Sequence, residues 1–156
     1  MKSKHQQVKI LLRYYSSLLD EETVETLWAN VVDEAKGHYK IDNIPFYGPL
    51  LASDDIVWAE YDDVEQMLTY RETITSSGNS VIQVVILNES IEMDEIRNEF
   101  EKMGCPSEKF NEGYFVMEIP FNLDYKPIKS KLDQLRSKNL IDYAEPCLSK
   151  KHSSKK

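Results

Sequence analysis

Residues 80–87, SVIQVVIL, lie where the pattern of this sequence changes. The stretch is rich in β-branched residues and predicts a strand. It follows the turn SSGNS, residues 76–80, in which Gly78 or Asn79 is expected to adopt a positive φ. Short apolar runs typical of strands precede this turn, whereas apolar residues recur at helical spacing after residue 88. The stretch therefore separates a region of strands alone from a region of strands and helices.

Two helices and three further strands are predicted after residue 88. Apolar residues recur at steps of three and four over residues 93–103, and a second amphipathic helix begins near Asp124. Two strands are expected on either side of the turn at 111–113, and a last strand over 140–148. From residue 80 the order is β, α, β, β, α, β, which is the order of the ferredoxin-like arrangement.

Five runs before residue 80 have the composition of strands and are joined by short segments rich in turn residues. Such strands predict a small curled antiparallel β-sheet or barrel. Trp28 and Trp58 lie at strand centres and are expected to fill its core. The runs cover residues 7–15, 22–32, 38–44, 55–61 and 65–75.

The predicted fold is therefore α+β, in three parts. Residues 1–79 form an acidic, β-rich half, and residues 80–148 form a ferredoxin-like half. The last eight residues, 149–156, are SKKHSSKK, which has no apolar residue to bury. We therefore expect a disordered basic tail there.

Charge is unevenly distributed along the chain. The net charge is −8, with 27 acidic and 19 basic residues. Residues 20–99 contain 19 acids and four bases, a net charge of −15, whereas residues 100–149 contain eight acids and seven bases. A surface of this kind repels phosphate backbones and attracts cationic proteins. Direct binding of nucleic acid is therefore not expected, and a cationic protein partner is.

Several classes of protein do not fit the sequence. The first apolar run is interrupted by Arg13 and reaches no cleavage site of small residues, so it is not a secretory signal. No segment has the roughly eighteen apolar residues of a membrane span. Cys105 and Cys147 have neither metal-ligand spacing nor an evident base beside them. We expect a cytoplasmic protein without a metal or another cofactor.

The segment KIDNIPFYGP, residues 40–49, allows two interpretations. Its two prolines and its glycine favour a corner between strands, in which Asp42 and Asn43 bond to the backbone. Alternatively, His38, Asp42 and Asn43 form the site of a small-ligand sensor or an enzyme. No nucleophile accompanies this histidine, so we assign no catalytic residue.

A second candidate site is AEYDDVEQ, residues 59–66, which has four carboxylates at the tip of a predicted hairpin. It lacks the glycine and the twelfth-position glutamate of a calcium loop. Such acids are either a solvated surface, a contact for a cationic partner or, least in keeping with the pattern, a metal site. The residues expected to contact a partner are Asp54, Asp55, Glu60, Tyr61, Asp62, Asp63 and Glu65.

Four motifs in order resemble an uncharacterised bacterial family, the domain of unknown function DUF4265. They are ETLWA (25–29), IDNIPFYG (41–48), DDIVWAE (54–60) and SGNS (77–80). The resemblance extends to about residue 148 and supplies no catalytic residues. It implies instead that the chain is similar to immunity proteins, the small acidic bacterial proteins that neutralise toxin domains of cell-contact or wall-associated systems.

Charge and resemblance together predict an immunity protein and not an enzyme. Toxin domains that cut nucleic acid have basic clefts, to which an acidic protein is attracted over long distances. The expected partner is a cognate cationic toxin domain, most plausibly a nuclease. Neither direct nucleic-acid binding nor membrane binding is expected, and the free chain is expected to be a monomer.

Overall fold

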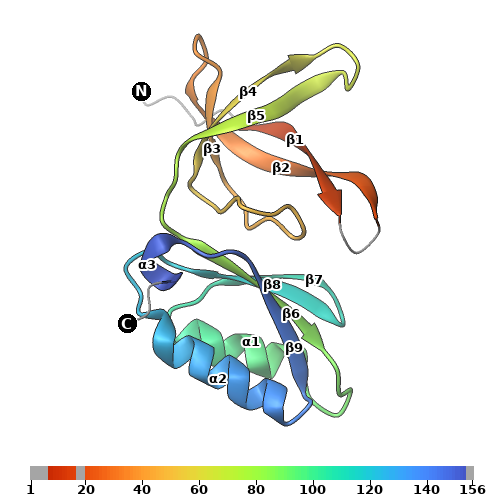
Figure 1. Ribbon diagram of the computed structural model, residues 1–156, viewed down its shortest axis with the longest axis vertical. Helices are drawn as coiled ribbons and strands as arrows, with labels where there is room; N and C mark the ends of the chain where they lie inside the picture. The colour runs from red at the N-terminus through yellow and green to blue at the C-terminus, as the bar shows by residue number, and fades with distance from the viewer. Residues whose placement is uncertain (1–6, 17–19, 154–156) are drawn as a thin grey trace. The chain divides into compact units, whose positions relative to one another are not determined.

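The computed structural model describes residues 7–16 and 20–153. The chain divides into two compact units, Met1–Ser77 and Gly78–Lys156, called unit 1 and unit 2 below (Figure 1). The regular elements of unit 1 are strands, whereas unit 2 combines strands with the α-helices of the described residues. The predicted α+β class is therefore confirmed.

Unit 1 is a closed five-stranded barrel. Neighbouring strands pair antiparallel in chain order, with registers such as Ile10 opposite Leu27. The barrel closes where β1 runs parallel to β5 and Leu11 lies opposite Thr69. This confirms the predicted barrel. Its strands are β1 Gln7–Ser16, β2 Glu21–Asp33, β3 His38–Ile41, β4 Ile56–Asp62 and β5 Met67–Thr75.

The barrel interior is filled by alternate residues of its strands. Ile10, Leu27, Ile41 and Val57 are at most 1% exposed and belong to one hydrophobic cluster. Burying each such side chain contributes about 1.5–3 kcal/mol relative to leaving it in water. Trp28 follows Leu27 and therefore points to the outer face, where 47% of it is exposed. The prediction that Trp28 fills the core was wrong, and Trp58 is only half-buried.

Unit 2 contains a four-stranded sheet in the order β7-β8-β6-β9, in which every neighbouring pair is antiparallel. Helices α1 and α2 cover one face of it (Figure 1). Phe100 of α1 and Leu132 of α2 pack with sheet residues such as Ile82 and Phe115. The elements are β6 Ser80–Ile86, α1 Met93–Lys102, β7 Ser107–Asn111, β8 Tyr114–Ile119, α2 Tyr125–Ser137, β9 Ile141–Cys147 and α3 Lys150–Ser153.

Helix α3 lies in the segment 149–156 that the sequence predicted to be disordered. That prediction was wrong for residues 149–153, and residues 154–156 lie outside the described part of the chain. The reason is His152, which is only 8% exposed. The tail has no apolar residue to bury, but the imidazole of His152 is buried and hydrogen-bonded in its place.

The His152 ring is bonded at both nitrogens. Nε2 lies 3.1 Å from the carbonyl oxygens of Pro120 and Leu123. Two carbonyls can only accept, so Nε2 carries a proton and donates. In the neutral ring Nδ1 then accepts from the hydroxyls of Ser80 at 2.6 Å and Ser149 at 3.1 Å. This network holds α3 against β6 and the segment that precedes α2.

Replacing His152 by alanine should destabilise unit 2 in a pH-dependent way. Burial lowers the pKa of His152 below 6.5. The stabilisation that His152 provides is therefore complete above about pH 6.5 and is lost as the pH falls through the lowered value. We expect His152→Ala to cost about 1–3 kcal/mol near neutral pH and less in acid.

Urea titrations at about pH 7.5 and about pH 5.5 would measure this difference, one on each side of the ordinary histidine pKa. Unfolding should be followed by NMR signals of unit 2, because both tryptophans, Trp28 and Trp58, lie in unit 1. A difference between wild type and variant that stays constant or grows in acid would contradict the assignment.

Candidate functional site

The segment between β3 and β4 is held by a carboxylate of β2. Glu25 accepts hydrogen bonds from the backbone N–H groups of Phe46, Tyr47 and Gly48, at 2.6, 3.1 and 2.7 Å. A Cβ at Gly48 would collide with the side chain of Leu12, so glycine permits this close approach. The carboxylate thus satisfies three amides in a segment that belongs to no strand.

Asn43 and Asp42 bond within the same corner. The side-chain oxygen of Asn43 accepts from the backbone N–H of Trp28 at 2.7 Å, and its amide donates to the carbonyl of Ile44 at 3.1 Å. The carboxylate of Asp42 accepts from the side chain of Gln7. These bonds favour the corner interpretation of KIDNIPFYGP over a ligand site, because they engage the polar groups that a ligand would need.

Asp55 has a structural role as well. It is 3% exposed, and its carboxylate accepts from the backbone N–H groups of Ala52 at 3.0 Å and Ser77 at 2.8 Å. A buried carboxylate with these bonds is not available to a partner protein. We therefore remove Asp55 from the set of residues predicted to contact one.

The turn between β4 and β5 depends on Asp62. Its carboxylate accepts from the backbone N–H groups of Val64 at 2.9 Å and Glu65 at 3.0 Å. It also accepts from the guanidinium of Arg71 at 3.0 Å. The backbone bond from Glu65 and then the Arg71 bond lower the pKa of Asp62. Asp62 therefore remains ionised while it shapes the turn.

Two arginines pair with two further carboxylates of this hairpin, Glu60 and Glu65. Arg71 pairs with Glu60 at 3.1 Å as well as with Asp62. Arg13, on β1, pairs with Glu65 at 2.5 Å and with Glu22 of β2 at 3.6 Å. Three of the acids predicted to contact a partner thus already bond to arginines of this chain. The pairs also connect the β1–β2 hairpin with the β4–β5 hairpin.

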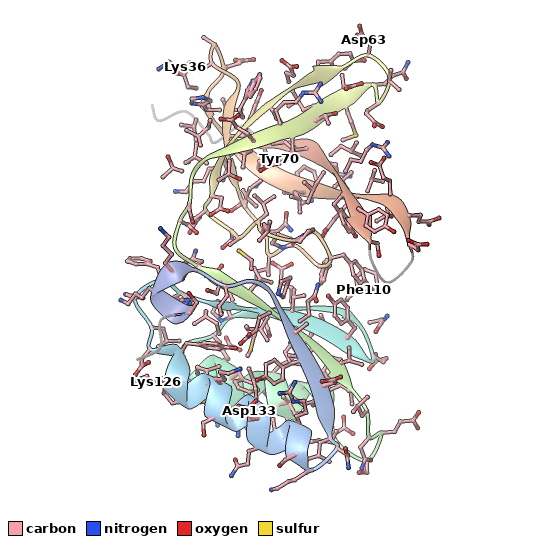
Figure 2. All side chains as sticks on the ribbon, viewed as in Figure 1. Lys36, Asp63, Tyr70, Phe110, Lys126 and Asp133 are labelled. Atoms are coloured by element: carbon pink, nitrogen blue, oxygen red, sulfur yellow. The ribbon has the colours of Figure 1, made fainter. Side chains whose placement is uncertain are left out.

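The most exposed side chains of the hairpin are largely apolar. Tyr61 is 60% exposed and Val64 is 90% exposed. Asp63, between them, is exposed and has no ion-pair partner among the residues that the structure describes (Figure 2). We call the set Glu60, Tyr61, Asp62, Asp63, Val64 and Glu65, with the paired Arg13, Glu22 and Arg71, the hairpin surface.

Asp54 lies apart from the hairpin surface. It is exposed and has a positive φ of 69° just before β4, whereas Asp62 ends the strand. At about 3.3 Å per residue, a strand of this length separates its two ends by about 20 Å. The predicted residues therefore do not form one continuous set, and Asp54 is not part of the hairpin surface.

Four residues of the hairpin surface were not predicted from the sequence: Arg13, Glu22, Val64 and Arg71. Arg71 had a signal, since it is one of only four bases in residues 20–99. No sequence signal pointed to Arg13, because its approach to Glu65 follows from closure of the barrel between β1 and β5.

The thiol of Cys105 is poorly suited to chemistry at neutral pH. Cys105 is buried, and burial raises the pKa of its thiol to about 12. The fraction of reactive thiolate at neutral pH is therefore very small. Within the described ranges, no group of three or more His, Cys, Asp or Glu side chains could hold a metal ion. No helix in those ranges is long and apolar enough to cross a membrane.

Most of the chain matches a family whose function is unknown. The chain belongs to DUF4265, a domain of unknown function, whose pattern matches residues 25–143. It is also similar to the crystal structure of a hypothetical protein from Neisseria gonorrhoeae, with 28% sequence identity and a TM-score of 0.80. That match covers 94% of this chain and 99% of the other. No curated protein matches the chain.

Replacing Glu25 by alanine should destabilise unit 1. Three backbone amides would lose their acceptor, which we expect to cost about 2–3 kcal/mol. Glu21→Ala is the matched control, because Glu21 is exposed on the same strand and should change stability by about 0.5 kcal/mol or less. Urea unfolding followed by tryptophan fluorescence would measure both, and equal effects would contradict the role given to Glu25.

Proposed function

We propose that this chain is a cytoplasmic immunity protein that binds and neutralises a cationic toxin domain, a nuclease, through the hairpin surface. The observation that carries the proposal is the pair of exposed side chains Tyr61 and Val64 among carboxylates. Tyrosine is among the residues that contribute most to binding when it lies in an interface.

Charge would assist binding both at long range and at contact. At long range, residues 20–99 carry a net charge of −15, which attracts a basic partner before contact. At short range, Arg13 and Arg71 hold Glu60, Asp62 and Glu65 in place. Exposed ion pairs add little to stability, but they reduce the entropy lost when a partner orders these side chains. Asp63 is left to meet a cation of the partner.

We also propose that unit 2 has the ferredoxin-like arrangement. The order β6-α1-β7-β8-α2-β9 and the sheet order β7-β8-β6-β9 support a ferredoxin-like unit 2. We further propose that the chain is not an enzyme, needs no cofactor, binds neither nucleic acid nor membrane directly, and is a monomer before it meets the toxin. The alternative is a ligand site near His38. It is less favoured because the side chain of Asn43 is already hydrogen-bonded to the backbone.

The test is binding of the full chain to the toxin domain encoded by the neighbouring gene. Calorimetry measures the affinity and stopped-flow mixing measures the association rate, each at about 25 mM and about 150 mM salt. Added salt screens the field and shortens its range, so electrostatic steering should be weaker at the higher concentration. Tyr61→Ala should weaken the affinity by about tenfold or more. Asp63→Lys should slow association severalfold, most strongly at low salt.

Glu89→Lys is the matched control for charge reversal. Glu89 is exposed, lies in unit 2 and is far along the chain from the hairpin surface. It changes the net charge by the same amount as Asp63→Lys, and it should slow association much less. Equal effects of the two reversals would reject the hairpin surface as the contact. Absence of binding by the wild-type chain at low salt would reject the proposed function.

A further inference from the structure

Unit 2 contains a hollow of about 490 Å³ that the function proposed above does not use. The first turn of α2, the end of β9 and helix α3 surround it. Its volume falls within the range of about 300–1,000 Å³ that is usual for small-molecule sites. Apolar residues Leu123, Tyr125 and Leu148 line it together with three lysines, Lys126, Lys129 and Lys151. Figure 2 shows Lys126 at the start of α2.

The two aromatic rings of the lining are buried, and their polar atoms are bonded within the chain. Tyr125 is 4% exposed, and its hydroxyl donates to Glu145 at 2.6 Å. The His152 ring lies 6.0 Å from the Tyr125 ring, and both of its nitrogens are already bonded. The polar atoms of these two rings therefore have partners. The apolar surface that remains for a ligand is that of Leu123 and Leu148, which are half-buried.

The rim of the hollow is cationic. Three lysines face two carboxylates, Asp124 and Glu145, in a chain whose net charge is −8. Lys129 is engaged, because its ammonium donates to Tyr143 at 3.0 Å and to Glu145 at 3.2 Å. Lys126 and Lys151 have no ion-pair partner in the described part of the chain. They are the two cations that remain for a ligand.

The carboxylate of Asp124 forms no ion pair with either lysine in the described part of the chain. Asp124 is the N-cap of α2, and its side chain accepts from the backbone N–H of Lys126 at 3.1 Å. The helix end is thus already capped, so the attraction for an anion comes from the lysine side chains. An ammonium group is a flexible point charge with three donors, which suits a phosphate or carboxylate head.

We propose that this hollow binds a small molecule that joins an anionic head to an apolar ring. The head lies between Lys126 and Lys151, and the ring covers the half-buried side chains of Leu123 and Leu148. The site belongs to unit 2 alone and is independent of the hairpin surface. Loss of either activity would therefore leave the other intact.

NMR titration of the full chain tests the site with defined probes. Phenyl phosphate and benzoate share the ring and differ in the head, so they show which anion is preferred. Inorganic phosphate contains the head alone, and benzyl alcohol contains the ring without charge. We expect phenyl phosphate or benzoate to shift backbone signals of residues 122–129 and 145–153, and to bind more tightly than either partial probe.

Charge-removing variants distinguish the site from general attraction. Lys126→Gln and Lys151→Gln should each weaken binding of the preferred probe by about fivefold or more. Lys138→Gln is the matched control, because Lys138 is exposed at the other end of α2, about 20 Å away along a 13-residue helix. The spectra of the wild type and of the three variants should all retain the dispersion of a folded unit 2.

Three results would overturn the proposal. One is that none of the four probes shifts the signals around the hollow. The second is that Lys138→Gln weakens binding as much as the variants at the rim. The third is that inorganic phosphate or benzyl alcohol alone binds as tightly as the complete probes, since the head and the ring would then not act together.

Discussion

The carboxylate of Glu25 is the contact on which the architecture of unit 1 depends. The segment between β3 and β4 belongs to no strand, so its amides require acceptors from elsewhere. Glu25 satisfies three of them, and Asn43 and Asp55 connect further parts of the corner to β2 and to the end of the barrel. These residues lie in the motifs that resemble the family. Their bonds give each of these three motif residues a structural role.

The two proposed sites use charge in different ways. In unit 1, arginines hold carboxylates in place around exposed Tyr61 and Val64, which suits a large partner with a complementary surface. In unit 2, two lysines border a hollow with an apolar lining, which suits a small molecule. Neither arrangement requires a chemical step. Under these two proposals, both units are binding modules.

Much of the fold could be predicted because it follows from local pattern. Alternation and turn residues located the strands, and the helical period placed the start of α2 near Asp124, which the structure shows to be the N-cap. Trp28 was misplaced because both faces of β2 carry apolar residues, so alternation alone did not show which face is inward. His152 was misplaced because its burial depends on Ser80 and on two carbonyls distant in sequence.

The sequence by itself determined the element order, the acidic bias of residues 20–99 and the hairpin that carries Tyr61. Only the tertiary structure decided which of those acids remain available. Closure of the barrel brings Arg13 to Glu65, and folding of the corner buries Asp55. The hollow beside Lys126 likewise forms only when α3 lies beside the start of α2. The physical reason is that hydrogen bonds and ion pairs depend on distance in space, whereas local sequence pattern reports only neighbours along the chain.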